Sequence, residues 1–178
     1  MVDTRTRLLD AATEVLLVAG AENFTLAAVA ERARVSKGGL LYHFPGKQSL
    51  VAALVDRLVG QFDAAVRSAG PEPGSATRAY LAETIEPTAG GAGAATDRLA
   101  AAVLAAALID PSALEPLRRT YRSWQRRLED DGIDPAVATA VRLAVDGWWM
   151  ARLLDLAPPA GEVHKRTYAL LNQLIERG

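Results

Sequence analysis

Apolar residues recur at helical spacing through almost the whole chain, and this pattern restricts the fold more than any other feature. Near the N-terminus the spacing i, i+3, i+4, i+7, i+8 and i+11 places one set of side chains on a single helix face: Leu8, Ala11, Ala12, Val15, Leu16 and Ala19. The alternation of apolar and polar residues that is typical of a strand does not persist for a strand's length. The sequence therefore predicts an all-α fold with about nine helices.

Glycine and proline divide the chain into its predicted helices. The first helix is expected to end at Gly20, and the clearest linker is the segment from Gly70 to Gly74. We expect an N-terminal three-helix domain over residues 1–46, and a helical ligand-binding and dimerisation domain over 47–178 that begins with a connecting helix over 47–69. The other helices are predicted over 25–33, 36–44, 75–87, 95–109, 112–131, 135–156 and 162–177.

Composition excludes several classes of protein. A chain of 178 residues can bury a core by itself, and without cysteine it has no disulfide framework, thiolate metal site or cysteine nucleophile. Two histidines and no phosphate-binding or zinc-protease motif argue against an enzyme, a metal site or a cofactor. With no export signal and no apolar window of about 20 residues, we expect a cytoplasmic protein that makes no membrane contact. A net charge of −1 does not by itself establish DNA binding.

Residues 25–44 carry the pattern of two short helices joined by a tight turn. Thr25 and Ser36 stand where the two helices begin, so each hydroxyl can accept a hydrogen bond from an unpaired backbone N–H. Leu40 and Phe44, four residues apart, are expected to bury the inner face of the second helix. Its outer face is then free to read DNA, as in a helix-turn-helix, and it presents Lys37, Gly38, Gly39, Leu41, Tyr42 and His43. The alternative is that the two helices are only packing elements of a bundle or an enzyme.

This segment resembles the DNA-binding part of the TetR (tetracycline-repressor-like) family of bacterial transcriptional regulators. The resemblance covers about residues 5–55 and rests on many positions: Thr25, Val29-Ala30, Val35-Ser36, Gly38, Leu40, Tyr42-His43-Phe44, and Lys47 followed by Leu50. The chain departs from the pattern at two places. Arg34 stands where the family often has glycine in the turn, and Leu41 stands where it often has a phosphate-contacting tyrosine.

The resemblance implies roles for individual residues. Thr25, Tyr42, His43 and Lys47 would hold DNA phosphates, whereas Lys37, Gly38 and Gly39 would face the major groove. Ser36 begins the reading helix, where backbone N–H groups favour phosphate, and Leu41 lies on the same outer face. These nine residues are the predicted DNA-binding set.

A candidate ligand site lies in the second half of the chain. Large aromatic residues among many alanines are candidates to line a pocket between helices, namely Tyr80, Tyr121, Trp124, Trp148 and Trp149. Each of them is equally well explained as a core or interface residue. Asp146 is a candidate to orient a ligand, although Arg142 four residues earlier can instead pair with it on a helix surface.

The last two predicted helices are suited to dimerisation, which a regulator needs to bind two half-sites about one helical turn apart. The final helix carries one apolar stripe of His164, Tyr168, Leu171 and Ile175, and another of Val163, Leu170 and Leu174. The helix before it carries Val137, Val141, Ala144, Val145 and Trp148 on one side. One stripe can face the core and the other a partner. The resemblance implies that these helices pair across a two-fold axis in a homodimer.

Taken together, these patterns predict a repressor that a small-molecule effector releases from a palindromic operator of double-stranded DNA. The alternative is a DNA-binding adaptor or architectural protein without a small-molecule sensor. A basic run from Arg118 to Arg127 can attract an anionic ligand or nucleic acid, or can form a solvated face paired with Glu115, Glu129 and Asp130. The solvated face is the favoured interpretation.

Overall fold

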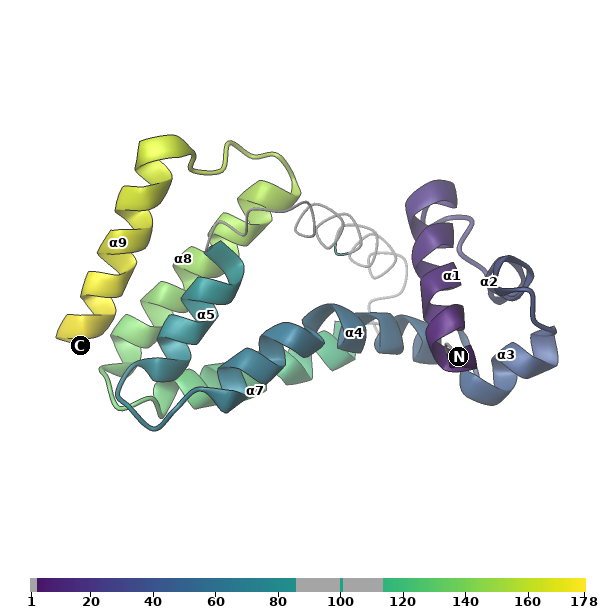
Figure 1. Ribbon diagram of the computed structural model, residues 1–178, viewed down its shortest axis with the longest axis horizontal. Coiled ribbons are helices and arrows are strands. Elements are labelled where there is room, and N and C mark those ends of the chain that lie inside the picture. Colours follow the sequence, from purple (N-terminus) through teal and green to yellow (C-terminus); the bar gives the residue numbers. More distant parts are fainter. Residues whose placement is uncertain (1–2, 86–99, 101–113) are drawn as a thin grey trace. The chain divides into compact units, whose positions relative to one another are not determined.

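The computed structural model describes residues 3–85, 100 and 114–178, and within these ranges the chain is helical and contains no strand (Figure 1). The prediction of an all-α fold is confirmed. The helix predicted over 95–109 lies outside the described residues apart from Ala100. The described helices are α1 (Thr4–Ala19), α2 (Leu26–Ala33), α3 (Lys37–His43), α4 (Lys47–Ser68), α5 (Ser75–Ile85), α7 (Glu115–Glu129), α8 (Pro135–Leu153) and α9 (Gly161–Arg177).

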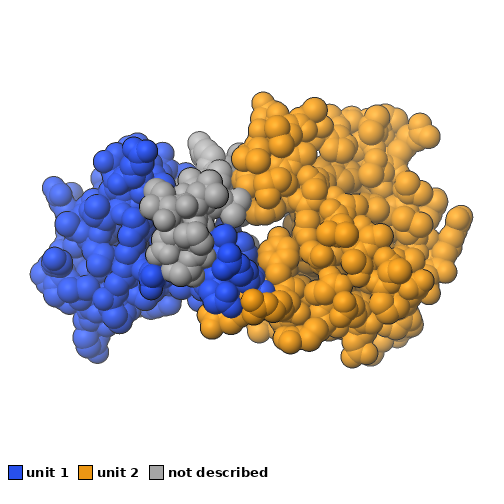
Figure 2. Space-filling model, turned by 180° about the vertical axis from the view of Figure 1, so that it is seen from behind, with its two compact units in different colours: residues 1–59, 91–118 blue, residues 60–90, 119–178 orange. Residues whose placement is uncertain are grey.

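The chain forms two compact units (Figure 2). Among the described residues, the first unit contains 3–59, 100 and 114–118, and the second contains 60–85 and 119–178. The long helix α4 therefore contributes its first half to one unit and its second half to the other. Within the described ranges, no helix combines the length and the apolar character that crossing a bilayer requires.

The first unit is built around one apolar cluster to which α1, α2, α3 and the first half of α4 all contribute. Leu8 of α1, Val29 of α2, Leu40 of α3 and Leu54 of α4 are completely buried in it. The predicted stripe of α1 is confirmed as far as Leu16, whereas its last member, Ala19, is the final residue of α1 and is exposed. Burial of apolar area from four helices thus fixes their mutual positions.

Side-chain caps set where α2 and α3 begin. Thr25 Oγ1 accepts a hydrogen bond from the backbone N–H of Ala28 at 3.1 Å, and Ser36 Oγ accepts one from Gly39 at 3.0 Å, as the sequence predicted. Between the helices, Arg34 ends α2 in the left-handed region at φ 55° and ψ 45°. A non-glycine residue pays about 1 kcal/mol for this conformation, so the turn is locally unfavourable.

In the second unit, α5 packs against α8 and α9. The core between these helices includes Tyr80 and Leu81 of α5, Val141 and Val145 of α8, and Ile175 of α9. Val141 and Val145 belong to the side of α8 that the sequence predicted to be apolar, but Ala144 of the same predicted set is exposed.

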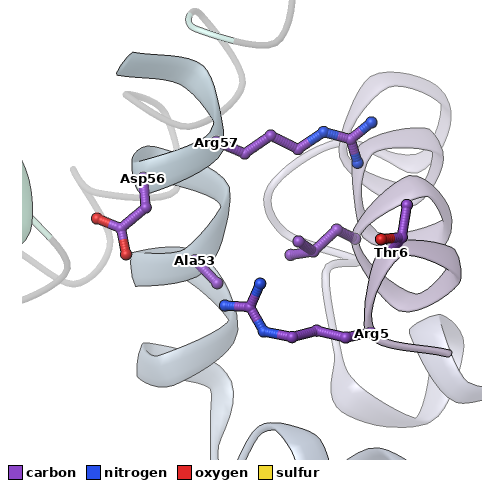
Figure 3. A pocket seen from close by; sticks show the side chains of 6 residues that line it. Arg5, Thr6, Ala53, Asp56 and Arg57 are labelled. Carbon is purple, nitrogen blue, oxygen red and sulfur yellow. The ribbon is translucent and has the colours of Figure 1, made fainter. Parts of the chain in front are cut away.

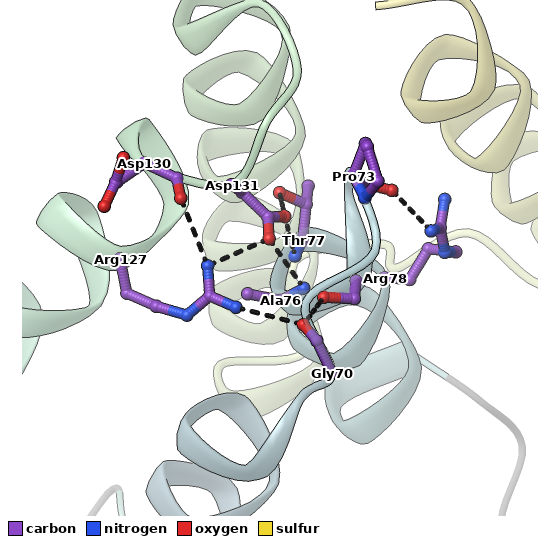
Figure 4. Close-up of polar contacts among 9 residues, drawn as sticks. Gly70, Pro73, Ala76, Thr77, Arg78, Arg127, Asp130 and Asp131 are labelled. Atoms are coloured by element: carbon purple, nitrogen blue, oxygen red, sulfur yellow. Dashed lines mark hydrogen bonds and ion pairs between the residues drawn. The ribbon is translucent and has the colours of Figure 1, made fainter.

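The N-terminus of α5 is capped by a carboxylate from a distant part of the chain (Figure 4). Asp131, which is 4% exposed, accepts hydrogen bonds from the backbone N–H groups of Ala76 at 3.0 Å and Thr77 at 2.8 Å, and from the Thr77 hydroxyl at 2.7 Å. Arg127 Nη1 forms an ion pair with Asp131 at 3.0 Å. A single buried carboxylate is therefore the acceptor for two backbone N–H groups and one hydroxyl, and it is the ion-pair partner of Arg127.

The turn before α5 is equally restricted. Gly74 has φ +74°, donates its N–H to the backbone carbonyl of Asp131 at 2.7 Å, and lies so close to α9 that a Cβ atom would be 2.5 Å from Ile175 Cγ2. Only glycine fits this position without a shift of α9. The start of α5 therefore contacts both the segment after α7 and helix α9 at Gly74.

We expect Asp131→Ala to lower the free energy of unfolding by about 3 kcal/mol, because it leaves buried donors and the Arg127 guanidinium without their acceptor. Urea denaturation followed by circular dichroism measures this. Asp130→Ala is the matched control, since its side chain is exposed, and we expect it to stay within about 0.5 kcal/mol of wild type. Equal midpoints for the two variants would show that the cap contributes nothing.

Candidate functional site

Helix α3 lies at the periphery of the first unit, beside α2 (Figure 1). Its inner face is anchored by Leu40, which is 0% exposed, and by Phe44, which is 2% exposed and ends the helix. Its outer face is exposed, with Tyr42 at 85% and Leu41 at 37%. Two short helices, a tight turn and a free outer face on the second helix form a helix-turn-helix, as predicted.

The remaining residues of the predicted DNA-binding set flank this face. Thr25 is the exposed cap of α2, and Lys47 is the exposed first residue of α4, with Nζ 5.4 Å from the centre of the Phe24 ring. His43 is half-buried, and its ring meets the Tyr42 ring edge to face at 5.2 Å. Gly39 is also half-buried, because it adjoins the Ser36 cap.

Charge on this surface has one sign. Residues 36–47 contain Lys37, His43 and Lys47 and no acidic residue. The exposed hydroxyls of Thr25, Ser36 and Tyr42 add hydrogen-bond donors. Cations and hydroxyl groups around an exposed helix are the side chains that contact DNA phosphates.

Polar contacts hold α1 against its neighbours and so support α2 and α3. Arg7 Nη2 donates to the backbone carbonyl of Ala33 at the end of α2, at 2.9 Å. Arg32 of α2 forms an ion pair with Glu14 of α1, and this contact holds the pKa of the Glu14 carboxyl below its usual value. Both partners of that pair are largely exposed, so its main effect is on orientation rather than on stability.

A cleft of about 410 Å³ lies between α1 and α4 of the same unit (Figure 3). Arg5 reaches into it from α1 and Arg57 from α4, with Thr6, Leu9, Ala53 and Asp56 also in its lining. Arg57 forms an ion pair with Asp10 at 2.6 Å. Two arginines are thus offset by two aspartates, so the cleft has no excess charge with which to select an anion.

Three of the predicted ligand-site aromatics come together in the second unit. Trp124 of α7 has its ring centre 5.7 Å from that of Tyr80 and 5.0 Å from that of Tyr121. Phe62 of α4 completes the group, at 4.7 Å from Tyr80 and 4.6 Å from Trp124. These four residues are called the aromatic cluster below.

Two carboxylates border the aromatic cluster. Asp146 accepts a hydrogen bond from the Tyr80 hydroxyl at 2.6 Å and forms an ion pair with Arg142 at 2.6 Å. Asp63 accepts one from Trp124 Nε1 at 2.9 Å and pairs with Arg67 at 2.7 Å. The predicted Arg142–Asp146 contact therefore forms, but in a half-buried position rather than on an open surface.

Burial controls the protonation of these groups. It raises the pKa of Tyr121 to about 12 and that of Tyr80 further. It also raises the pKa of Asp146, against the hydrogen bond from Tyr80 and the charge of Arg142, which both lower it. Asp146 is therefore a carboxylate at the border of an apolar cluster, where a cationic or hydrogen-bonding neighbour stabilises its charged form.

The structure does not bring Trp148 and Trp149 into the contacts of this cluster. Trp148 is buried on α8 and meets the ring of His164 of α9 at 4.8 Å. Trp149 is half-buried and, as the next residue of a helix, points about 100° away from Trp148. Sequence reasoning missed Phe62 and Asp63 because it treated α4 only as a connector, although an aromatic residue beside an acidic one was a visible signal.

Helices α8 and α9 each bury one side and expose apolar side chains on another. Leu171 and Ile175 of the first predicted α9 stripe are buried. The exposed set, called the α8/α9 apolar face below, comprises Leu143 and Met150 of α8, Leu154 directly after α8, and Val163, Leu170 and Leu174 of α9. Val163, Leu170 and Leu174 are the second of the two predicted α9 stripes, and the sequence left open which stripe faces the core and which a partner.

The arginine run of α7 is mainly a solvated face. Trp124 and Leu128 form the buried side of the helix. Arg118 lies 3.7 Å from Glu115, and Arg127 pairs with Asp131. The Glu115 contact is one of the predicted pairings, whereas the partner of Arg127 is the buried Asp131 and not Glu129 or the Asp130 side chain.

Two family models match the chain. Residues 8–54 match the bacterial regulatory proteins of the tetR family, and residues 74–176 match the tetracyclin repressor-like C-terminal domain. Among curated relatives, the transcriptional regulator TtgR of Pseudomonas putida is 36% identical over 70 residues, which are 39% of this chain and 33% of TtgR. SrpR, also of Pseudomonas putida, is 38% identical over 53 residues, 30% of this chain and 25% of SrpR. The matches thus span a third or less of these two relatives.

Solved structures share the fold over nearly the whole chain. A transcriptional regulator from Rhodococcus sp. Rha1 has a TM-score of 0.73 at 24% identity, with 99% of this chain and 97% of that chain covered. GusR from Salmonella enterica has a TM-score of 0.73 at 19% identity, covering 97% and 95%. The multidrug binding protein EbrR, in its complex with ethidium, has a TM-score of 0.67 at 23% identity, covering 97% and 98%.

The fold, the helix-turn-helix and the two family matches lead to one assignment. This chain belongs to the TetR family of bacterial transcriptional regulators.

Proposed function

We propose that this protein is a dimeric repressor that binds a palindromic operator and is released from it by a small-molecule effector. Regulators of the TetR family bind DNA and dimerise, and they are not enzymes. The observation that carries the proposal is the outer face of α3, which is exposed while its inner face is anchored in the core. As a regulator of bacterial DNA, it would act in the cytoplasm.

The geometry supports two kinds of DNA contact. The hydroxyls of Thr25, Ser36 and Tyr42 and the basic side chains of His43 and Lys47 would hold backbone phosphates. The residues that would face base edges in the major groove are Lys37, Gly38, Gly39 and Leu41. Phosphate contacts would position α3, and base contacts would select the sequence.

Selection from a random pool of duplex DNA tests the DNA-binding role. We expect wild-type protein to enrich a palindrome whose half-sites are centred about 10 base pairs, or a multiple of that, apart. Lys37→Ala should weaken binding and relax selectivity at the base it reads, whereas Tyr42→Ala should weaken binding by about tenfold on all sequences.

Lys165→Ala is the matched control for Lys37→Ala, because it removes the same charge from an exposed position on α9. We expect it to leave operator affinity unchanged. No enrichment by the wild-type protein, or equal binding by wild type and both α3 variants, would exclude the proposed role of α3.

The α8/α9 apolar face is the proposed dimer interface. Its six large apolar side chains are exposed on two helices that pack against each other. Large apolar side chains exposed on neighbouring helices are typical of an interaction site rather than of an ordinary solvated surface. A second copy related by a two-fold axis would cover it with the same residues.

Leu170→Glu should convert the dimer to a monomer, because two carboxylates would be buried near the two-fold axis without partners. Light scattering after size exclusion measures the mass, and circular dichroism confirms that the helices persist. Val18→Glu, at an exposed apolar position on α1, should leave the mass unchanged. A Leu170→Glu protein that stays dimeric would place the interface elsewhere.

The aromatic cluster with Asp146 is the proposed effector site, and Trp148 and Trp149 of the predicted set are left out of it because they make no contact with the cluster. Flat rings beside a carboxylate favour an aromatic ligand with a polar or cationic group. EbrR, which shares this fold, has been solved with ethidium and with malachite green, and this precedent suggests ethidium as a first probe.

Helix α4 offers a route from the effector to the DNA. Its Phe62 belongs to the aromatic cluster, whereas its Leu50 and Leu54 belong to the apolar cluster that anchors α3. A ligand that shifts Phe62 would therefore move α4, and the other end of α4 belongs to the core of the first unit. Because α4 is continuous, the shift would alter the spacing of the two reading helices in the dimer.

We expect ethidium to quench Trp124 fluorescence and to weaken operator binding, and we expect the operator to weaken ethidium binding by the same factor, as linkage requires. Phe62→Ala should reduce that factor. Ethidium binding with no effect on operator affinity would contradict the effector route. Operator binding by a protein that takes up no ligand in its second unit would favour the alternative of an adaptor or architectural protein.

A further inference from the structure

The outer face of α3 carries an apolar strip that no hydrogen-bonding side chain interrupts. Gly38 and Leu41 are three residues apart, so they are neighbours on one side of the helix. Both are exposed, Leu41 to 37%. Lys37 and Tyr42 border the strip on the same face.

Nothing in the part of the chain that the structure describes requires glycine at position 38. A Cβ atom there would meet only Ser36 Oγ, at 3.9 Å, which is an ordinary contact distance, and the residue lies within a helix without a positive φ. Glycine weakens a helix relative to alanine. The absent side chain therefore costs the fold stability without a benefit to packing, which suggests that a partner outside the chain comes close at this point.

Leu41 is likewise not needed to complete the core. Leu40 and Phe44 already close the inner face of α3. A leucine side chain offers no hydrogen bond, and in the major groove the only apolar feature of a base pair is the 5-methyl group of thymine. The absence of a side chain on Gly38 gives the space that a base pair would need to come into contact with Leu41.

We propose that Leu41 reads the 5-methyl group of one thymine in each half-site of the operator, with Gly38 as the point of closest approach. This inference rests on the proposed DNA-binding function and adds to it a specificity-determining residue. Leu41 would select the methyl group of the base and not its hydrogen-bonding groups.

Substitution of dT by dU removes only the methyl group and tests the inference directly. Each thymine of the operator selected by the wild-type protein is replaced in turn, and the Kd is measured by fluorescence anisotropy. We expect one position per half-site at which dU weakens wild-type binding by about fourfold, the effect of one buried methyl group. Leu41→Ala should bind both DNAs equally at that position.

Gly38→Ala provides a second test, because a glycine with only a structural role would not change operator affinity when the fold is stabilised. We expect this variant to melt at a higher temperature than wild type and yet to bind the operator at least tenfold more weakly, roughly the cost of a small misplacement at a tight contact. Gly60→Ala is the matched control, because Gly60 is also a helix residue with no atom near its missing side chain. It should melt at a higher temperature and bind the operator as wild type does.

The outcomes separate this inference from the proposed function. An operator that wild type binds, with no thymine whose methyl group matters or with the same dU effect in Leu41→Ala, would overturn the role of Leu41 and leave the DNA-binding function in place. Unchanged operator affinity in Gly38→Ala would overturn the close approach. No selected DNA at all would overturn the proposed function and this inference together.

Discussion

The apolar cluster shared by α1, α2, α3 and the first half of α4 is the constraint on which the exposed outer face of α3 depends. A helix of seven residues is not stable in isolation, so α3 exists because Leu40 and Phe44 are buried in that cluster. The same burial fixes which side of α3 is turned outward. A defect in the cluster would therefore be felt at Lys37 and Tyr42, even though neither side chain is part of it.

Helix α4 gives the two units a common element. Its N-terminal half contributes Leu50 and Leu54 to the core that holds α3, and its C-terminal half contributes Phe62 to the aromatic cluster. A helix interior resists bending because each residue is held by backbone hydrogen bonds to the next turn. A change around Phe62 is thus harder to absorb locally than it would be in a loop, and this stiffness is the physical basis of the proposed coupling between ligand and DNA.

Local signals in the sequence were sufficient for the helix-turn-helix. Thr25, Ser36 and the Leu40–Phe44 pair act over three or four residues, so their roles could be predicted from spacing and side-chain chemistry. The cap that Asp131 provides to α5 could not, because its partners lie more than fifty residues away in the chain. Phe62 was missed because α4 was interpreted only as a connector, whereas its ring contacts Tyr80 and Trp124 of two other helices.

Two residues of the helix-turn-helix lower its local stability, and they do so in different ways. Arg34 adopts a left-handed conformation in the turn, where glycine would be free of strain, and its exposed side chain shows no packing role. Gly38 lies in a helix where alanine would fit. Natural sequences keep such conflicts mainly at functional sites. Since they flank Ser36, these two conflicts lie where the proposed contact with the operator would form.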